Sequence, residues 1–224
     1  MSITEYNGCG VVAMCGKNCV AIASDKRYGV QQQSISQELQ RIYKVHDKLF
    51  IGMSGLVTDM QTLYVSKALT WCRMQKFNFR VKLYELREER KIKPSVFANV
   101  VSTVLYEARF GPWFVEPIVA GLEDKVDEKT GEVRKNVPYI CAQDLIGAPV
   151  YTTDFVVAGT SSEELYGTCE AFYKKDQEPE DLFETVSQAL LAAVDRDCLA
   201  GWGAVVHIIT PDKIITRELK TRQD

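Results

Sequence analysis

The sequence offers two candidate nucleophiles beside glycine residues, the thiol of Cys9 and the hydroxyl of Ser54. Cys9 lies between Gly8 and Gly10 ahead of an apolar run, and a thiol is a competent nucleophile. Ser54 lies in the sequence Gly-Met-Ser-Gly-Leu at 52–56, which lacks the second glycine of a nucleophile elbow at the required position. No histidine and carboxylate present themselves to activate it, so we interpret Ser54 as a hydrogen-bonded turn residue.

Other common chemical motifs are absent or lack their context. Gly8-x-Gly10 precedes a predicted strand and opens no helix, so it does not predict a dinucleotide site, and there is no Walker lysine motif. His46 is expected in a hairpin turn and His207 in a buried strand. We interpret both histidines as ordinary hydrogen-bonded residues.

The cysteines of the chain are odd in number, form no Cys-x-x-Cys pair and mostly have apolar neighbours. Buried free thiols in a reducing compartment explain this pattern better than a disulfide framework or a zinc site, which would need more histidines. The seven are Cys9, Cys15, Cys19, Cys72, Cys141, Cys169 and Cys198.

Length, charge and hydropathy exclude several classes of protein. With 224 residues, 46% of them hydrophobic, the chain can bury a substantial core, which favours one domain. A net charge of -3 gives no electrostatic signature for nucleic acid or for anionic lipid. No apolar run has the length that spans a bilayer, and no secretory signal begins the sequence. We expect a soluble, non-secreted protein that binds neither nucleic acid nor membranes.

The elements that would position these residues alternate in blocks. Strands are predicted at 11–14, 19–24, 41–45 and 49–53, which form two successive hairpins. A helix should follow with Met60, Tyr64, Ala68 and Cys72 on one face, then a charged segment at 85–93 and a helix that begins at Pro94.

The second half repeats this order. Strands are expected at 117–121, 139–142 and 155–158, with an exposed polar excursion at 123–136. Ser161 with Glu164 resembles a capping box, Pro179 should begin the last helix, and 204–209 with 213–219 should form a closing hairpin. The pattern predicts an α+β fold, in which two antiparallel sheets pack face to face between two helical layers, a four-layer αββα sandwich.

Several segments resemble the proteasome β family of N-terminal-nucleophile hydrolases, over nearly the whole chain. The sequence at 20–27, Val-Ala-Ile-Ala-Ser-Asp-Lys-Arg, is similar to the strand that ends in the family's active-site aspartate. The glycine-rich turn at 51–59 and the loop Asp-Cys-Leu-Ala-Gly-Trp-Gly at 197–203 are similar too. Segments at 83–87, 110–113, 116–121, 144–147 and 182–190 resemble a member that the family uses without catalysis.

The resemblance implies a set of vestigial active-site positions. With Asp25 matched to the family aspartate, Cys9 falls at the catalytic threonine and Arg41 at the lysine that lowers the nucleophile's proton affinity. In place of that lysine, Arg41 cannot donate and recover a proton as a compact amine can. Ala200 falls at one of the family's serines and removes a hydroxyl from the proton relay. The remaining matches are Thr160 and Ala200 to two serines, Asp197 to a second aspartate and Gly201 to the glycine after it.

The resemblance therefore implies a non-catalytic structural β subunit of the 20S core, with residues 1–8 as a short uncleaved leader and residues 9–224 as one domain. Segments 63–74 and 123–136 would be surface insertions. Implied partners are β neighbours in the same ring, the α ring, the opposite β ring and regulatory particles that bind the assembled core, and the expected location is cytoplasm and nucleus. No cofactor is required.

Two alternatives and one metal site remain open at this stage. Cys9 could act as a cysteine-type nucleophile after cleavage at Gly8, or the chain could be a free-standing binding module. The resemblance also implies a possible main-chain site for Mg²⁺ or another hard cation at Val194, Asp197 and Ala200, which leaves no sequence signature because backbone oxygens are the ligands.

Overall fold

The fold was analysed in a computed structural model that describes residues 2–64, 76–126 and 131–223. The helices are η1 (Ile3–Glu5, a 3₁₀ turn), α1 (Val57–Leu63), α2 (Lys76–Glu88), α3 (Pro94–Tyr106), α4 (Ser162–Phe172) and α5 (Pro179–Val194). The strands are β1 (Gly10–Gly16), β2 (Cys19–Asp25), β3 (Tyr28–Val30), β4 (Gln33–Ser36), β5 (Ile42–His46), β6 (Leu49–Gly55), β7 (Val115–Val126), β8 (Val133–Gln143), β9 (Pro149–Thr152), β10 (Phe155–Gly159), β11 (Ala204–Ile209) and β12 (Ile214–Leu219).

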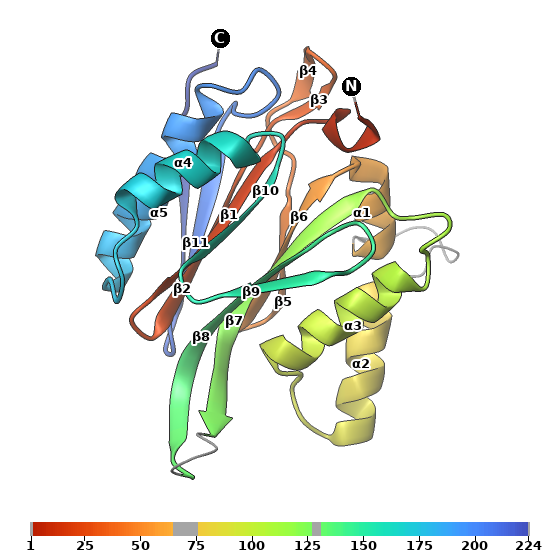
Figure 1. The fold of residues 1–224 in the computed structure, drawn as a ribbon, viewed down its shortest axis with the longest axis vertical. Helices are drawn as coiled ribbons and strands as arrows, with labels where there is room; N and C mark the ends of the chain where they lie inside the picture. The colour runs from red at the N-terminus through yellow and green to blue at the C-terminus, as the bar shows by residue number, and fades with distance from the viewer. Residues whose placement is uncertain (1, 65–75, 127–130, 224) are drawn as a thin grey trace.

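Two five-stranded antiparallel sheets form the centre of the molecule (Figure 1). The first sheet has the strand order β10-β1-β2-β11-β12 and is covered by α4 and α5, while the second has the order β5-β6-β7-β8-β9 and is covered by α1, α2 and α3. Both halves of the chain contribute to the first sheet, because β1 pairs with β10 and β2 pairs with β11. This pairing places Gly10, near the start of the chain, beside Gly159.

Three hydrophobic clusters lie between the four layers. One joins the second sheet to α1–α3, one joins the first sheet to α4 and α5, and one fills the space between the sheets. Because strand side chains alternate in direction, Val12 faces the helices while Val11 and Ala13 face the other sheet. The predicted αββα sandwich is confirmed.

Helices α3 and α5 begin where the sequence predicted. Pro94 and Pro179 each occupy the first turn, where the missing N–H costs no helical hydrogen bond. The apolar face of α5 is fully buried against β1 and β2, as its spacing indicated. In the part of the chain that the structure describes, no helix has the length and apolar character needed to cross a membrane.

Three short strands were not predicted from the sequence. β3 and β4 form an additional hairpin between β2 and β5, so the prediction of only two hairpins there was wrong. All four residues of β4 are exposed, and β9 is an edge strand with three exposed residues. Such strands are held by main-chain pairing, and without a buried face they show no hydrophobic alternation.

The polar excursion predicted at 123–136 is in large part a β hairpin. β7 continues to Val126 and β8 starts at Val133, and Lys125 pairs with Arg134 in the extension, which projects from the body of the molecule (Figure 1). Glu123 is buried, because its carboxylate accepts the main-chain N–H of Ser95 at 3.2 Å. The high polarity hid the strands, since both faces of the projecting arm meet water.

Two helix boundaries also differ from the prediction. The charged segment at 85–93 begins inside α2, which ends at Glu88, because glutamate, arginine and leucine are good helix formers. Ser161 precedes α4 without a side-chain capping bond, since its hydroxyl lies 3.4 Å from the carbonyl oxygen of Cys9. Met60 and Tyr64 are buried as predicted, whereas Ala68 and Cys72 lie outside the described residues.

Candidate active site

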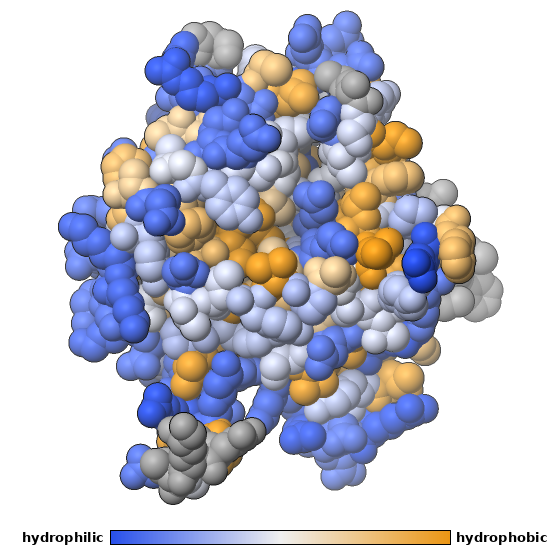
Figure 2. All heavy atoms as spheres, viewed as in Figure 1, coloured by the Kyte–Doolittle hydropathy of each residue, from blue (hydrophilic) through white to orange (hydrophobic). Residues whose placement is uncertain are grey.

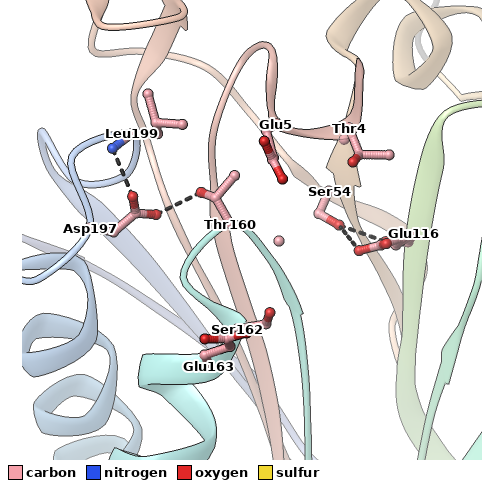
Figure 3. A pocket seen from close by; sticks show the side chains of 11 residues that line it. Thr4, Glu5, Ser54, Glu116, Thr160, Ser162, Glu163, Asp197 and Leu199 are labelled. Atoms are coloured by element: carbon pink, nitrogen blue, oxygen red, sulfur yellow. Dashed lines mark hydrogen bonds between the residues drawn. The ribbon is translucent and has the colours of Figure 1, made fainter. Parts of the chain in front are cut away.

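A hollow of about 390 Å³ lies where the ends of β6 and β10 face each other (Figure 3). Side chains from both sheets, from α4 and from the loop after α5 surround it, and the start of the chain forms one side. The lining residues are Thr4, Glu5, Ser54, Gly55, Glu116, Gly159, Thr160, Ser162, Glu163, Asp197 and Leu199. Four of them carry carboxylates and none is basic, so the hollow has an acidic, hydroxyl-rich lining.

Cys9 lies beneath this hollow and is fully buried. A methyl group added to Gly159, which lines the hollow, would come within 2.8 Å of the Cys9 Sγ. Burial raises the pKa of the Cys9 thiol, while the positive charge of Arg41 and the main-chain N–H groups of Gly55 and Thr160 oppose that rise. The thiol is therefore protonated and unreactive in this environment.

Thr160 joins the main chain of Cys9 to Asp197. The Thr160 hydroxyl donates to Asp197 Oδ2 at 2.6 Å and accepts the main-chain N–H of Cys9 at 3.0 Å. The other oxygen of Asp197 accepts the N–H of Leu199 at 2.9 Å, which fixes the loop after α5. The peptide nitrogen of Cys9 is thus a satisfied hydrogen-bond donor.

Asp25 and Arg41 form a buried ion pair behind Cys9. Arg41 Nε lies 3.2 Å from Asp25 Oδ1, and neither side chain is exposed. Asp25 also accepts the N–H groups of Gly10, Arg27 and Gly201. Burial raises the pKa of the Asp25 carboxyl, and Arg41 and the three N–H groups oppose that rise.

Arg41 is committed to the main chain as well as to the carboxylate. Its Nη2 donates to the carbonyl oxygens of Gly8 at 2.6 Å and of Arg27 at 2.7 Å. A guanidinium held by two carbonyls and one carboxylate is a fixed charge, and its high proton affinity prevents it from serving as a base. The contacts of Arg41, which the resemblance matches to the catalytic lysine, are therefore those of a structural residue.

Ala200 and Gly201 complete the predicted set. Ala200 is buried in the cluster beneath α4 and α5 and offers only a methyl group. Gly201 has a φ of 120°, which favours glycine, and its N–H reaches Asp25 Oδ2 at 3.2 Å. The structure thus links Cys9 to Thr160 and Asp197, and Asp25 to Arg41 and Gly201, while Ala200 has no polar side-chain atom to join them.

The candidate cation residues lie together in a second, smaller hollow of about 90 Å³. Val194, Asp197 and Ala200 all contribute to its lining, together with residues near the end of the chain. The Val194 carbonyl accepts the N–H of Asp197 at 3.3 Å and keeps a second lone pair. The residues present are therefore compatible with an oxygen-ligated cation, and among the described residues no cluster of acidic, histidine or cysteine side chains suggests another metal.

The remaining chemical candidates have structural roles. Ser54 donates to the Glu116 carbonyl oxygen at 3.2 Å, with the Glu116 carboxylate at 3.3 Å. His46 bonds the Ile92 carbonyl and His207 bonds Thr216, as expected of ordinary polar residues. Of the described cysteines, Cys9, Cys15, Cys19, Cys141 and Cys169 are buried free thiols, whereas Cys198 is an exposed one and Cys72 is outside the described residues.

Two residues of the site were missed in the sequence. Arg27 is 1% exposed and donates to carbonyl oxygens of Leu199 at 2.9 Å and Gln31 at 2.8 Å. Asn7, in what we call the N-terminal segment (residues 3–8), is also buried and bonds two distant main-chain groups. Arg27 ends the 20–27 segment and Asn7 lies in no motif, and the sequence indicated a role for neither because only tertiary structure supplies their partners.

Comparison with known proteins places this geometry in context. The family model described as "Proteasome subunit" matches residues 5–209. Proteasome subunit beta type-3 of Picea mariana is 56% identical to this chain over 224 residues, which is 100% of both chains. The beta type-3-A subunit of Arabidopsis thaliana is 58% identical and the beta type-3 subunit of Dictyostelium discoideum 52% identical, again over 100% of both chains.

Proposed function

Because this chain belongs to the proteasome subunit family, we propose that it serves in the 20S core as a structural β subunit without a catalytic nucleophile of its own. Full-length identity of 48–58% to beta type-3 subunits of several organisms supports the β-subunit assignment. Its assembly with other proteasome subunits follows from the family. The non-catalytic role is argued from the site.

The state of Cys9 carries that argument. An N-terminal nucleophile needs a free amine and a reachable side chain, because the amine acts as the base. With the Gly8–Cys9 bond intact, as we propose, the Cys9 nitrogen is a peptide nitrogen that donates to Thr160, and the thiol is fully buried. The folded N-terminal segment stands on the other side of that peptide bond.

The surrounding residues support the same conclusion. Arg41 is held by two carbonyls and Asp25, and Ala200 supplies no hydroxyl to relay a proton. Catalytic groups act cooperatively, so the loss of one costs orders of magnitude in rate. Neither the relatives nor this geometry supports the alternative of a Cys9-dependent peptidase.

The finer partner assignments are neighbours in the β ring, the facing α ring, the opposite β ring and regulatory particles on the assembled core. Apolar residues at the surface support these assignments. Phe110 is 97% exposed and Leu86 79% exposed, and an obligate interface is a setting that would bury such side chains. Figure 2 shows apolar side chains among polar ones on this face of the molecule, and in β9 the side chains of Val150 and Tyr151 are exposed. A ring closes when each member presents two different complementary faces.

Cation binding and location belong to the same proposal. When bound, a hard cation such as Mg²⁺ would take main-chain oxygens of Val194, Asp197 and Ala200 and would stiffen the loop after α5. An increase in the unfolding midpoint with added MgCl₂, but not with NaCl of equal ionic strength, would support this site. Fluorescent tagging should find the chain in both cytoplasm and nucleus.

The decisive experiment uses purified particles that contain the full-length chain. We expect an intact mass that includes residues before Cys9, and no label from a peptide epoxyketone. Cys9→Ala should leave each peptidase activity within about twofold, as should the matched control Cys169→Ala at another buried thiol. A chain that begins at Cys9 and carries label on its thiol would overturn the proposal. Failure to sediment with a large particle would favour the free-standing module.

A further inference from the structure

Asn7 ties the N-terminal segment to two other elements of the fold, β3 and α1. Its side-chain nitrogen donates to the carbonyl oxygen of Gly29 in β3 at 2.8 Å, and its side-chain oxygen accepts the N–H of Val57 at 3.0 Å. The main chain of the segment adds a bond from the Gln31 N–H to the Tyr6 carbonyl at 2.8 Å. Asn7 itself is 4% exposed, so water cannot replace these partners.

The bond to Val57 fills a gap at the start of α1. Val57 is the first residue of that helix, and its N-cap residue, Leu56, has no side chain that can accept a hydrogen bond. Asparagine is a preferred N-cap residue because its oxygen accepts such N–H groups. Here the acceptor comes from a residue 50 positions earlier, so α1 and the N-terminal segment stabilise each other.

The same segment borders the hollow above Cys9. Thr4 and Glu5 line it on one side, and Gly8 connects the segment directly to Cys9 (Figure 3). The Gly8 carbonyl is held by Arg41, and the Gly8 Cα packs so closely on Leu199 that an added methyl group would lie 2.1 Å from the Leu199 carbonyl oxygen. The segment is therefore held at its end nearest Cys9, where Asn7 and Gly8 are buried, while Ile3 and Tyr6 are exposed.

We propose that Asn7 is the latch of the N-terminal segment and that the latched segment closes the approach to Cys9, so that release of this segment controls access to the thiol. The inference rests on the proposed function and deepens it. A closed approach keeps peptides away from the nucleophile position whichever residue occupies that position. The chemistry of the latch is that of a peptide unit, one N–H donor and one carbonyl acceptor in a single plane.

Iodoacetamide is the probe, because it alkylates an accessible thiolate: the Cys9 sulfur forms a bond to carbon, iodide leaves and the thiol proton passes to solvent. In particles with the full-length chain, Asn7→Ala should speed Cys9 alkylation by at least about tenfold. Hydrogen exchange at the Gln31 and Val57 amides should accelerate with it. Asn99→Ala, an exposed asparagine in α3, is the matched control and should change neither reading by more than about twofold.

Three outcomes would overturn the latch. Alkylation and exchange could remain as in the unaltered chain, exchange could accelerate while Cys9 stays inert, or Asn99→Ala could act as strongly as Asn7→Ala. If Asn7→Ala does not assemble, Asn7→Asp keeps the acceptor for Val57 and removes the donor to Gly29. Cys9 of that variant should be alkylated faster than Cys9 of the unaltered chain, and an unaltered rate would contradict the proposal.

The unaltered chain supplies an independent test. If one opening event exposes both the segment and the thiol, the opening constants from Val57 exchange and from Cys9 alkylation should agree within about threefold, and a difference above about tenfold would contradict the latch. The proposed function has a separate signature. A peptidase activity that Cys9→Ala abolishes would overturn the non-catalytic role, whether or not Asn7 holds the segment.

Discussion

The hydroxyl of Thr160 lies 2.6 Å from the carboxylate of Asp197, and this contact joins the end of β10 to the loop after α5. The same hydroxyl accepts the N–H of Cys9, which directly precedes β1, the strand that pairs with β10. The Thr160 side chain therefore links Cys9, at the position of the family's nucleophile, to the end of β10 and to the loop after α5. Removal of the Thr160 hydroxyl should lower the stability of the fold.

Thr160→Val tests this contact with a side chain of nearly the same shape. The Cys9 N–H and the Asp197 carboxylate each lose a partner, so the free energy of unfolding should fall by about 1–3 kcal/mol. Denaturant unfolding of the full-length chain would measure it. Thr103→Val, on an exposed part of α3, is the control and should change stability by less than about 0.5 kcal/mol. Equal effects of the two variants would refute the assignment.

The Asp25–Arg41 ion pair should show strong coupling in a double-mutant cycle. Arg41→Met leaves a buried carboxylate without its cation, and this should cost about 3–5 kcal/mol. Asp25→Asn with Arg41→Met removes both charges, so the double variant should be less destabilised than the sum of the single variants. The unfolding free energies of all four chains give the coupling, and additive effects would contradict a close pair.

Gly8 has a φ of 62° and almost no space for a side chain. Gly8→Ala should therefore lower the free energy of unfolding by about 1–3 kcal/mol, through strain and the clash with Leu199. Gly167→Ala is the matched control, because this exposed glycine of α4 has open space around it and should gain about 0.5–1 kcal/mol. Thermal unfolding would rank the variants, and a neutral Gly8→Ala would exclude a tightly seated segment.

The stability of the fold should decrease as the pH falls below about 6.5. Burial lowers the pKa of His207, which packs against Phe50, and of His46. In that range the unfolded chain binds more protons than the native chain, so stability is complete above the unfolded pKa and is lost toward the native one. Urea midpoints between pH 5 and pH 8 would show the slope. His207→Gln should reduce the slope of the urea midpoint against pH. An unchanged slope would show that His207 does not cause the pH dependence.

The sequence determined the layers of this fold because they depend on local patterns. Short apolar runs bounded by turn residues predicted β1 and β2, and Pro94 and Pro179 predicted where α3 and α5 begin. The same patterns missed the short strands β3, β4 and β9, which are held by main-chain pairing, and of these β4 and β9 are mostly exposed. A strand without a buried face leaves no periodic signal.

Resemblance to a family also located Cys9, Asp25, Arg41, Thr160 and Asp197 in the sequence, since their types and spacing are local facts. Only the tertiary structure decided what they do to one another. The pairing of β1 with β10 brings Thr160 to Cys9, and the fold seals Asp25 and Arg41 from water. Nothing in the sequence indicated a role for Asn7. Its hydrogen-bond partners are main-chain groups of Gly29 and Val57, which approach it only when both sheets have packed.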